Sequence, residues 1–369
     1  MAERTISFAR GAPSADILPH EGVREAATRA LESDWENALS YGTGRGHPGL
    51  CEWIAERHGV QPEQVMITNG SMEGAALLFR HLVSAGDRVV VEQPTYDRTL
   101  LLLQQAGAEL VGAPLESDGI DPATIEAACA EGGVRLAHVI PNFHNPAGCT
   151  LSAEKRSRLV KLAADNGFIL FEDDPYRLIS FDDAQAPTML DLDGADRVIH
   201  ASSFSKSISP GVRVGYLVGP ADQIATFAKR ANEQYISPNM LAESIVFEFC
   251  RSGGLDENLK VVNAALRERR DALVEALHKY IPEAEFVVPA GGYFLWLDLN
   301  GEGKVDSKAL LAQARMLGVT FVAGPDFMLE GGSSSLRLSF APVPASDVAE
   351  GVARLAQALD QVREGVPAR

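Results

Sequence analysis

The sequence has few cysteines and a shortage of basic side chains. Its four cysteines, Cys51, Cys129, Cys149 and Cys250, lie far apart and form no CxxC pair, so neither a zinc knuckle nor a disulfide framework is expected. The 33 basic residues face 50 acidic ones, and the net charge of -17 gives no general affinity for nucleic acid. We therefore expect free thiols, and any anionic ligand must be held by a local site.

Long hydrophobic runs are also absent. No stretch approaches the roughly 18 to 20 apolar residues that a membrane span requires, and residues 1–8 do not resemble a secretory signal. Hydrophobic residues make up 46% and charged residues 22%, which is typical of globular proteins and favours neither a disordered nor a fibrous chain. We expect a cytoplasmic protein without a metal site and without a membrane or nucleic-acid partner.

Between about residues 64 and 219 one pattern repeats: a short β-branched run, a loop rich in Gly, Pro, Asn or Ser, and an amphipathic stretch. The runs predict buried strands at 65–68, 88–91, 136–140, 168–171, 198–201 and 214–218. This alternation indicates an α/β domain with a mostly parallel sheet. Ligands bind such sheets beyond the carboxyl ends of the strands, so the loops after these runs are the candidate site.

The pattern changes after about residue 253. A long helix over 255–280, strands at 293–299, 319–322 and 336–340, a helix at 307–317 and a terminal helix predict a smaller α+β domain. We place the large domain at 46–252 and the small domain at 253–369. Residues 1–45 are expected to cover the active site and to pack on the small domain.

The most specific segment lies between two predicted strands, at residues 202–216, with the sequence SSFSKSISPGVRVGY. A lysine among hydroxyls, with a glycine and an arginine beyond it, can form an imine while its neighbours hold a phosphate. A desolvated amine near positive charge loses its proton and becomes nucleophilic. An isolated SxxK is more often a solvated lysine in a polar loop. The functional interpretation of Lys206 therefore depends on the motifs in the other loops.

Those loops carry further polar motifs. Residues 68–75 (TNGSMEGA) lead from a strand into a helix, whose start can bind an anion, although Ser71 could instead simply cap the helix. Residues 141–148 (PNFHNPAG) contain an Asn-Pro turn, and 171–176 (FEDDPY) end a strand with three acids. In 334–340 (SSLRLSF) an arginine suited to a carboxylate should face one side of a strand.

In this order and spacing, the motifs resemble the SxxK, PGxRxGY, PxxxNPxG and DxxY signatures of the fold-type I, class I and II aminotransferases, which use pyridoxal 5'-phosphate (PLP). The resemblance covers nearly the whole chain and is nearest to the 2-aminoadipate and aromatic or branched-chain subgroup. It implies the aspartate aminotransferase-like fold, in which a seven-stranded-type sheet is sandwiched by helices and a smaller α+β domain follows.

The same resemblance assigns site residues. Lys206 is implied to carry PLP as a Schiff base, Asp173 to pair with the protonated pyridine nitrogen, and Tyr96 to stack on the ring. The other implied cofactor contacts are Gly70, Ser71, Met72, Asn145, Tyr176, Ser203, Ser205, Arg213 and Tyr41.

Substrate contacts follow in the same way. Arg337 is implied to clamp the α-carboxylate together with Asn145, and the segment containing Arg10 and Gly11 is implied to cover the substrate. Arg10 or Arg45 could read a distal carboxylate, although each could equally be a solvated arginine. Tyr41 resembles the tyrosine lent to the partner subunit's phosphate, which would require a homodimer. The sequence alone does not assign a catalytic role to His144, because such a role depends on the geometry around its side chain.

The implied reaction is ping-pong transamination. Lys206 moves the Cα proton as general base and then acid, a 2-oxo acid leaves, and a second 2-oxo acid restores PLP from pyridoxamine 5'-phosphate. The same motifs also serve β-lyases, decarboxylases, and cyclising or eliminating synthases. A MocR-like PLP-sensing regulatory module is a further alternative. The acidic charge and a family-like pattern that begins by Ile6 argue against it.

Overall fold

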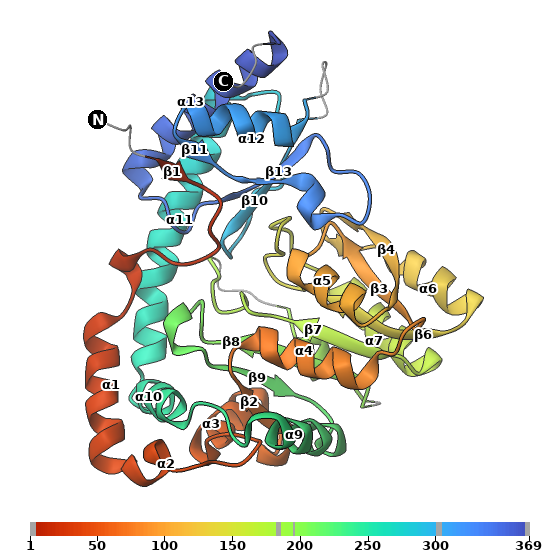
Figure 1. Cartoon of the computed structure of the whole chain (residues 1–369), viewed down its shortest axis with the longest axis vertical. Coiled ribbons are helices and arrows are strands. Elements are labelled where there is room, and N and C mark those ends of the chain that lie inside the picture. The colour runs from red at the N-terminus through yellow and green to blue at the C-terminus, as the bar shows by residue number, and fades with distance from the viewer. Residues whose placement is uncertain (1–4, 182–185, 195, 300–304, 366–369) are drawn as a thin grey trace.

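The computed structural model describes residues 5–181, 186–194, 196–299 and 305–365. Its larger part is built on an eight-stranded sheet flanked by helices (Figure 1). Across the sheet the strands are β2 (Val65–Thr68), β9 (Gly215–Val218), β8 (Val198–Ser203), β7 (Ile169–Asp173), β6 (Val134–Val139), β3 (Arg88–Gln93), β4 (Glu109–Glu116) and β5 (Gly119–Ile120). Strands β4, β3, β6, β7 and β8 run parallel, whereas β9 is antiparallel to both its neighbours.

The mostly parallel sheet is therefore confirmed, but the sequence analysis missed β4 and β5. Strand β4 contains Gly112 and Pro114, and much of it is only partly buried. Because glycine and proline weaken a strand pattern, this strand near the sheet edge gives little sequence signal. Strand β5 has two residues, too few for a periodic pattern.

Helices cover both faces of the sheet because alternate strand residues point to opposite sides. On one face, Phe171 of β7 packs in a core with residues of α4, α5 and α9. On the other, Leu170 packs with α6, α7 and α8, and Ile67 of β2 with α3 and α10. These helices are α3 (Pro48–His58), α4 (Ser71–Leu82), α5 (Asp97–Gln105), α6 (Pro122–Glu131), α7 (Ala153–Asn166), α8 (Met189–Leu192), α9 (Ala221–Tyr235) and α10 (Met240–Arg251).

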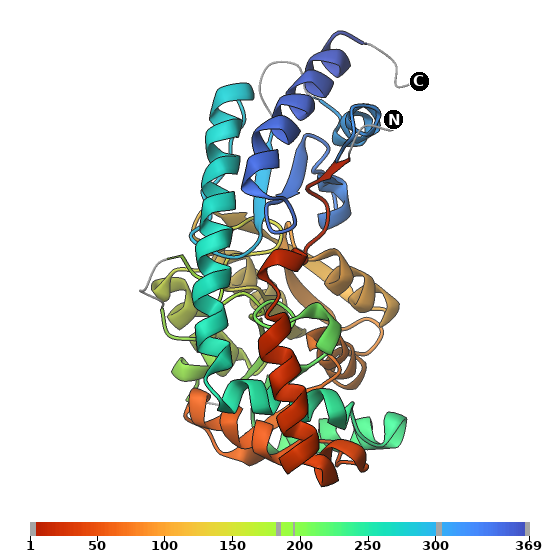
Figure 2. The same cartoon turned by 90° about the vertical axis from the view of Figure 1, so that its left-hand side faces the viewer.

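The smaller part pairs an antiparallel sheet with helices. Strand β13 (Ser335–Ser339) lies between β10 (Phe294–Asp298) and β12 (Val322–Ala323). Helix α11 (Gly254–Tyr280) runs along most of the height of the molecule in Figure 2 and packs against α13 (Ala345–Arg363), which also contacts α12 (Ser307–Met316).

The N-terminal segment joins the two parts. Strand β1 (Ile6–Ser7) pairs in parallel with β11 (Val319–Thr320) of the smaller part. The chain then descends to α1 (His20–Ser33) and α2 (Trp35–Leu39), beside the larger part (Figure 2). Short 3-10 turns lie at Ala15–Ile17, Pro62–Gln64, Pro210–Val212 and Gly324–Phe327.

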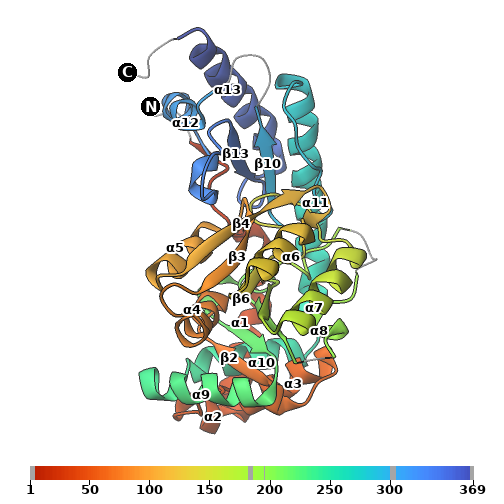
Figure 3. The same ribbon diagram turned by 90° about the vertical axis from the view of Figure 1, so that its right-hand side faces the viewer.

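This arrangement gathers the predicted loops. The smaller part stands above the sheet in Figure 3, and strands β3, β6, β7 and β8 all end at one edge because they are parallel. The four cysteines are unpaired, as expected. Among the helices in the described residues, none has the length and apolar character of a membrane span.

Candidate active site

A cavity of about 320 Å³ lies where the strand ends face β10, β13 and the N-terminal segment. It brings together most of the residues assigned by the sequence resemblance. They are Gly11, Ser71, Met72, Tyr96, Asn145, Asp173, Tyr176, Ser203, Ser205, Lys206, Arg213 and Arg337. Residues separated by more than 300 positions in the chain thus share one cavity.

Lys206 lies in the turn that follows β8. Its Nζ donates a hydrogen bond to the carbonyl oxygen of Gly11 at 2.8 Å. Burial, followed by the positive charges of Arg337 and Arg213, lowers the pKa of Lys206 to about 8, and Asp173 opposes this shift. About a tenth of the amine is therefore unprotonated at pH 7, in the form that a nucleophile requires.

The start of α4 forms an anion cradle. Its backbone begins at Ser71, preceded by Gly70 with a φ of 87°. This positive φ favours glycine, and the absence of a Cβ atom leaves room for the Arg213 guanidinium to approach the backbone. The hydroxyl of Ser203, which lies 2.8 Å from that of Ser205, completes a polar wall. Helix N-H groups, hydroxyls and an arginine suit a phosphate.

Asp173 ends β7 and is 8% exposed. Its Oδ2 lies 3.4 Å from Nε2 of His138, whereas its buried Oδ1 has no hydrogen-bond partner within the described residues. A buried carboxylate oxygen without a donor is costly, so the position suits a ligand that brings a protonated nitrogen. His138 was missed in the sequence, where it is one polar residue in an apolar strand.

Arg337, on β13, faces the same cavity and is almost fully buried. Its Nη1 donates to Oδ1 of Asn145 at 2.9 Å and its Nη2 to the carbonyl oxygen of Ala9 at 2.8 Å. Its buried Nε has no partner within the described chain. The guanidinium lies over the ring of Phe294, with 4.2 Å to the centroid. Burial lowers its pKa, and a carboxylate would satisfy the desolvated charge.

Two tyrosines line the cavity. Tyr96 precedes α5, and burial raises the pKa of its phenol. Tyr176 is fully buried, and Nζ of Lys206 lies 5.7 Å from its ring centroid. Tyr293 donates from its hydroxyl to the carbonyl oxygen of Lys206 at 2.9 Å and so fixes the turn that carries the lysine.

Three of the predicted or considered residues lie elsewhere. Arg10 is exposed and is not among the residues lining the cavity. Tyr41 is 83% exposed and also lies outside it. Arg45 donates hydrogen bonds to the carbonyl oxygens of Pro62 and Val65, so its guanidinium is occupied in holding a loop.

The geometry gives His144 a supporting position. Its Nε2 lies 2.9 Å from Oε2 of buried Glu92, and its Nδ1 accepts from the backbone N-H of Ala147 at 3.2 Å. These partners place the proton on Nε2. Glu92 also accepts from the N-H of Ile140 at 2.9 Å, so the pair connects the end of β3 to the loop that carries Asn145.

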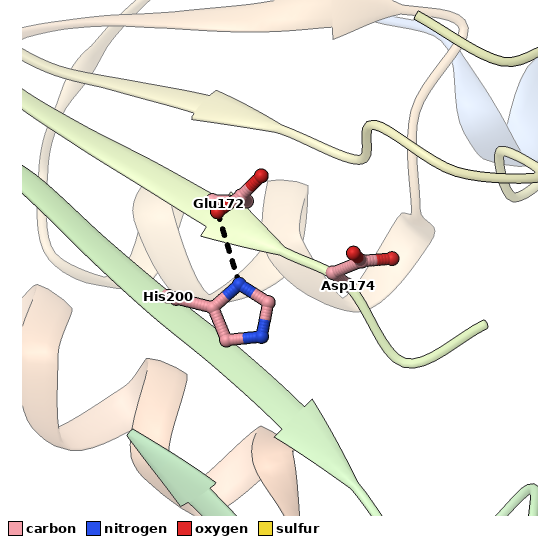
Figure 4. Close-up of side chains that lie close together, drawn as sticks. All are labelled: Glu172, Asp174 and His200. Atoms are coloured by element: carbon pink, nitrogen blue, oxygen red, sulfur yellow. Dashed lines mark hydrogen bonds and ion pairs between the residues drawn. The ribbon is translucent and has the colours of Figure 1, made fainter. Parts of the chain in front are cut away.

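The acids on either side of Asp173 point to the opposite face of the sheet. There Glu172 accepts a 3.0 Å hydrogen bond from Nδ1 of His200 (Figure 4) and bonds from two backbone amides at the start of α8. Asp174 accepts from Nδ2 of Asn142 at 2.7 Å, and burial raises its pKa to about 6. The three side chains lie close enough for a metal ion, but Glu172 already uses both oxygens as hydrogen-bond acceptors.

Comparison with known proteins agrees with this geometry. The family model described as aminotransferase class I and II matches residues 4–355. The chain is 33% identical to a 2-aminoadipate transaminase of Thermus thermophilus over 359 residues, which covers 96% of this chain and 90% of the relative. It is 31% identical to aromatic-amino-acid aminotransferase 1 of Thermococcus litoralis over 369 residues, covering 96% and 88% of the two chains.

A solved structure is equally similar. The crystal structure of an α-aminoadipate aminotransferase from Thermus thermophilus, complexed with N-(5'-phosphopyridoxyl)-L-leucine, superposes with a TM-score of 0.93 at 32% identity. The alignment covers 98% of this chain and 94% of that one.

Proposed function

Because the chain belongs to the class I and II aminotransferases, a PLP-dependent family with the aspartate aminotransferase-like fold, we propose that transamination occurs in the cavity around Lys206. The chemistry moves an amino group between an L-amino acid and a 2-oxo acid. One observation carries the assignment: an amine with a lowered pKa, a carboxylate oxygen without a partner and a buried arginine share one cavity. The family and its named members favour transamination over lyase, decarboxylase or synthase chemistry.

The cavity suits PLP at each end. The start of α4, Ser203, Ser205 and Arg213 would hold the phosphate, and Oδ1 of Asp173 would accept from the ring nitrogen. When bound, PLP supplies an electron sink that stabilises negative charge at the substrate Cα. Asp173 keeps the ring nitrogen protonated and so maintains that capacity.

The chain's own residues orient the substrate and move its proton. Arg337 offers two or more N-H groups to the α-carboxylate, and Asn145, bonded to Arg337, fixes the guanidinium plane. Lys206 lines the same cavity, where its unprotonated Nζ would take the Cα proton and later return it as a general acid. Tyr293 holds the lysine's backbone in place during both transfers.

The proposed working unit is a homodimer. Tyr41 follows α2, which also presents exposed Trp35 and Leu39. An apolar groove of about 470 Å³ lies nearby, lined partly by Leu241 and reaching Arg213 of the anion cradle. A second copy covering this surface would bury its apolar side chains and could bring Tyr41 to the partner's phosphate.

Covalent labelling tests the site. Reduction of the PLP-loaded enzyme with borohydride, followed by peptide mapping, should find the cofactor on Lys206. Lys206→Ala should lose the visible absorbance band and all turnover, because no other group replaces the amine. Lys161→Ala, which changes an exposed lysine paired with Asp165, is the matched control. A label on another lysine, or turnover in Lys206→Ala, would refute the proposal.

Mixing variants tests the shared site. Tyr41→Ala should weaken PLP binding without unfolding the protein. Dimers formed from Tyr41→Ala and Lys206→Ala subunits contain one site with both residues intact, so activity at limiting PLP should rise above that of either variant alone. No rise at limiting PLP, in dimers shown to have exchanged subunits, would mean that Tyr41 does not act across the interface.

A further inference from the structure

The wall of the active-site cavity contains an ion pair that the proposed mechanism does not use. Asp97 and Arg98 begin α5, directly after Tyr96, and both line the cavity. The other cavity cations have assignments: Lys206 to the cofactor and the proton, Arg213 to the phosphate, and Arg337 to the α-carboxylate. Arg98 is a further cation in the wall of this cavity, and the proposed mechanism assigns it no ligand group.

The Asp97–Arg98 pair is loose. Nε of Arg98 lies 3.6 Å from Oδ2 of Asp97, and the side chains are 58% and 36% exposed. Within the described residues, the Arg98 guanidinium makes no hydrogen bond, so its donors remain available. An exposed pair of neighbouring residues in this geometry contributes little to stability. Arg98 can therefore exchange Asp97 for another carboxylate at small cost.

The pair also lies near groups that are assigned to the cofactor ring and the substrate. The negative charge of Asp97 raises the pKa of Tyr96, after the larger effect of burial, and Arg98 opposes it. Asp97 likewise favours the charged form of Arg337, whose pKa burial lowers. Asp97 thus lies within electrostatic reach of both Tyr96 and Arg337, and Arg98 lies within reach of Tyr96.

On the basis of the proposed function, we propose that Arg98 recognises the distal carboxylate of dicarboxylic amino acids and 2-oxo acids. With the α-carboxylate on Arg337, the second carboxylate takes the place of Asp97 on the Arg98 fork. An uncharged side chain leaves the Asp97–Arg98 pair intact. Arg10 and Arg45, the alternatives from the sequence, lie outside this cavity.

Equilibrium binding to the PLP-loaded enzyme tests Arg98 without relying on turnover. Calorimetry would compare glutarate, an unreactive dicarboxylate, with pentanoate, which has the same chain length and one carboxylate. Arg98→Gln should weaken glutarate binding about 10- to 100-fold, because two charge-assisted hydrogen bonds are lost. Pentanoate affinity should stay within about 2-fold. Asp97→Asn should tighten glutarate binding, because it removes the competing carboxylate.

Arg158→Gln is the matched control, because Arg158 is an exposed arginine paired with Glu126 on the outer helices. It should change neither affinity. Equal weakening of both ligands by Arg98→Gln, or of neither, overturns the inference. If Arg98→Gln does not fold, Arg98→Lys keeps the charge without the fork and should lose part of the glutarate preference. Borohydride labelling of the same preparations separates this inference from the proposed function. If PLP labels Lys206 but Arg98→Gln does not change the preference for glutarate over pentanoate, the Arg98 inference fails and the proposed function stands.

Discussion

The end of strand β7 allows a comparison of the two faces of the central sheet. Asp173 points to the cavity, and Oδ1 of its carboxylate lacks a donor within the described chain. Glu172, one residue earlier, points to the other face and accepts from His200 and two backbone amides. Two adjacent buried carboxylates therefore have opposite degrees of hydrogen bonding.

The difference separates structure from function. Buried polar groups in native proteins are nearly always hydrogen-bonded, and Glu172 follows that rule, although Oδ1 of Asp174 on the same face has no partner within the described residues. In the cavity, Oδ1 of Asp173 and Nε of Arg337 are both buried without a partner. A ligand in the cavity could complete the hydrogen bonding of these two groups at once. Substitutions on the two faces should consequently change different measured quantities.

The largest effect is expected at Glu172, whose two carboxylate oxygens both accept hydrogen bonds. Glu172→Ala leaves the imidazole of His200 and two amides buried without their acceptor, which should lower the free energy of unfolding by about 3 to 5 kcal/mol. Urea denaturation measures the loss. Asp173→Ala should lower the free energy of unfolding far less, because Oδ1 of Asp173 makes no hydrogen bond within the described residues. Equal destabilisation by both variants would contradict the claim that Glu172 stabilises the fold and Asp173 does not.

Asp173→Ala should act on the reaction instead. Without the carboxylate the ring nitrogen loses its partner, and kcat/KM should fall about 100- to 1,000-fold, or about 3 to 4 kcal/mol. Steady-state kinetics at saturating PLP check this, with circular dichroism confirming the fold. Glu126→Ala, on the exposed surface of α6, serves as the control. Near-normal kcat/KM in Asp173→Ala would remove this residue from the catalytic machinery.

Much of the site could be predicted from the sequence because its residues follow strands in short polar motifs. The β-branched runs located the strands, and their parallel order placed the loops of Asn145, Asp173 and Lys206 at one edge. Alternation along β7 also separates Asp173 from Glu172. These features depend on local sequence, where spacing and side-chain type carry the information.

The partners of these residues could not be predicted in the same way. His138 and His200 come from β6 and β8, the two neighbours of β7, so their contacts depend on sheet order and register. Arg98 reaches the cavity because α5 starts directly after Tyr96, whereas Arg10 is exposed elsewhere. The orientation of such side chains is fixed by tertiary packing rather than by a motif.

A smaller effect concerns Asp174 on the Glu172 face. Burial raises its folded-state pKa to about 6, from 3.8, so the folded state holds the proton more tightly. The resulting stabilisation is complete below about pH 4 and is lost as pH rises through 6, by about 3 kcal/mol. Asp174→Asn should flatten that dependence in denaturation between pH 4 and 7, whereas exposed Asp165→Asn should not. Parallel curves for wild type and Asp174→Asn would contradict it.

The smallest effect returns to Lys206 on the cavity face. Burial, then the charges of Arg337 and Arg213, hold its pKa at about 8, so PLP capture by the cofactor-free protein should accelerate as pH rises through 8. Arg337→Gln removes a positive neighbour that disfavours the protonated amine, and the midpoint should move upward by less than about 1 pH unit. Visible absorbance during PLP addition follows the rate. Arg158→Gln should leave the midpoint in place, and a midpoint that is also unmoved in Arg337→Gln would show that burial alone sets the pKa.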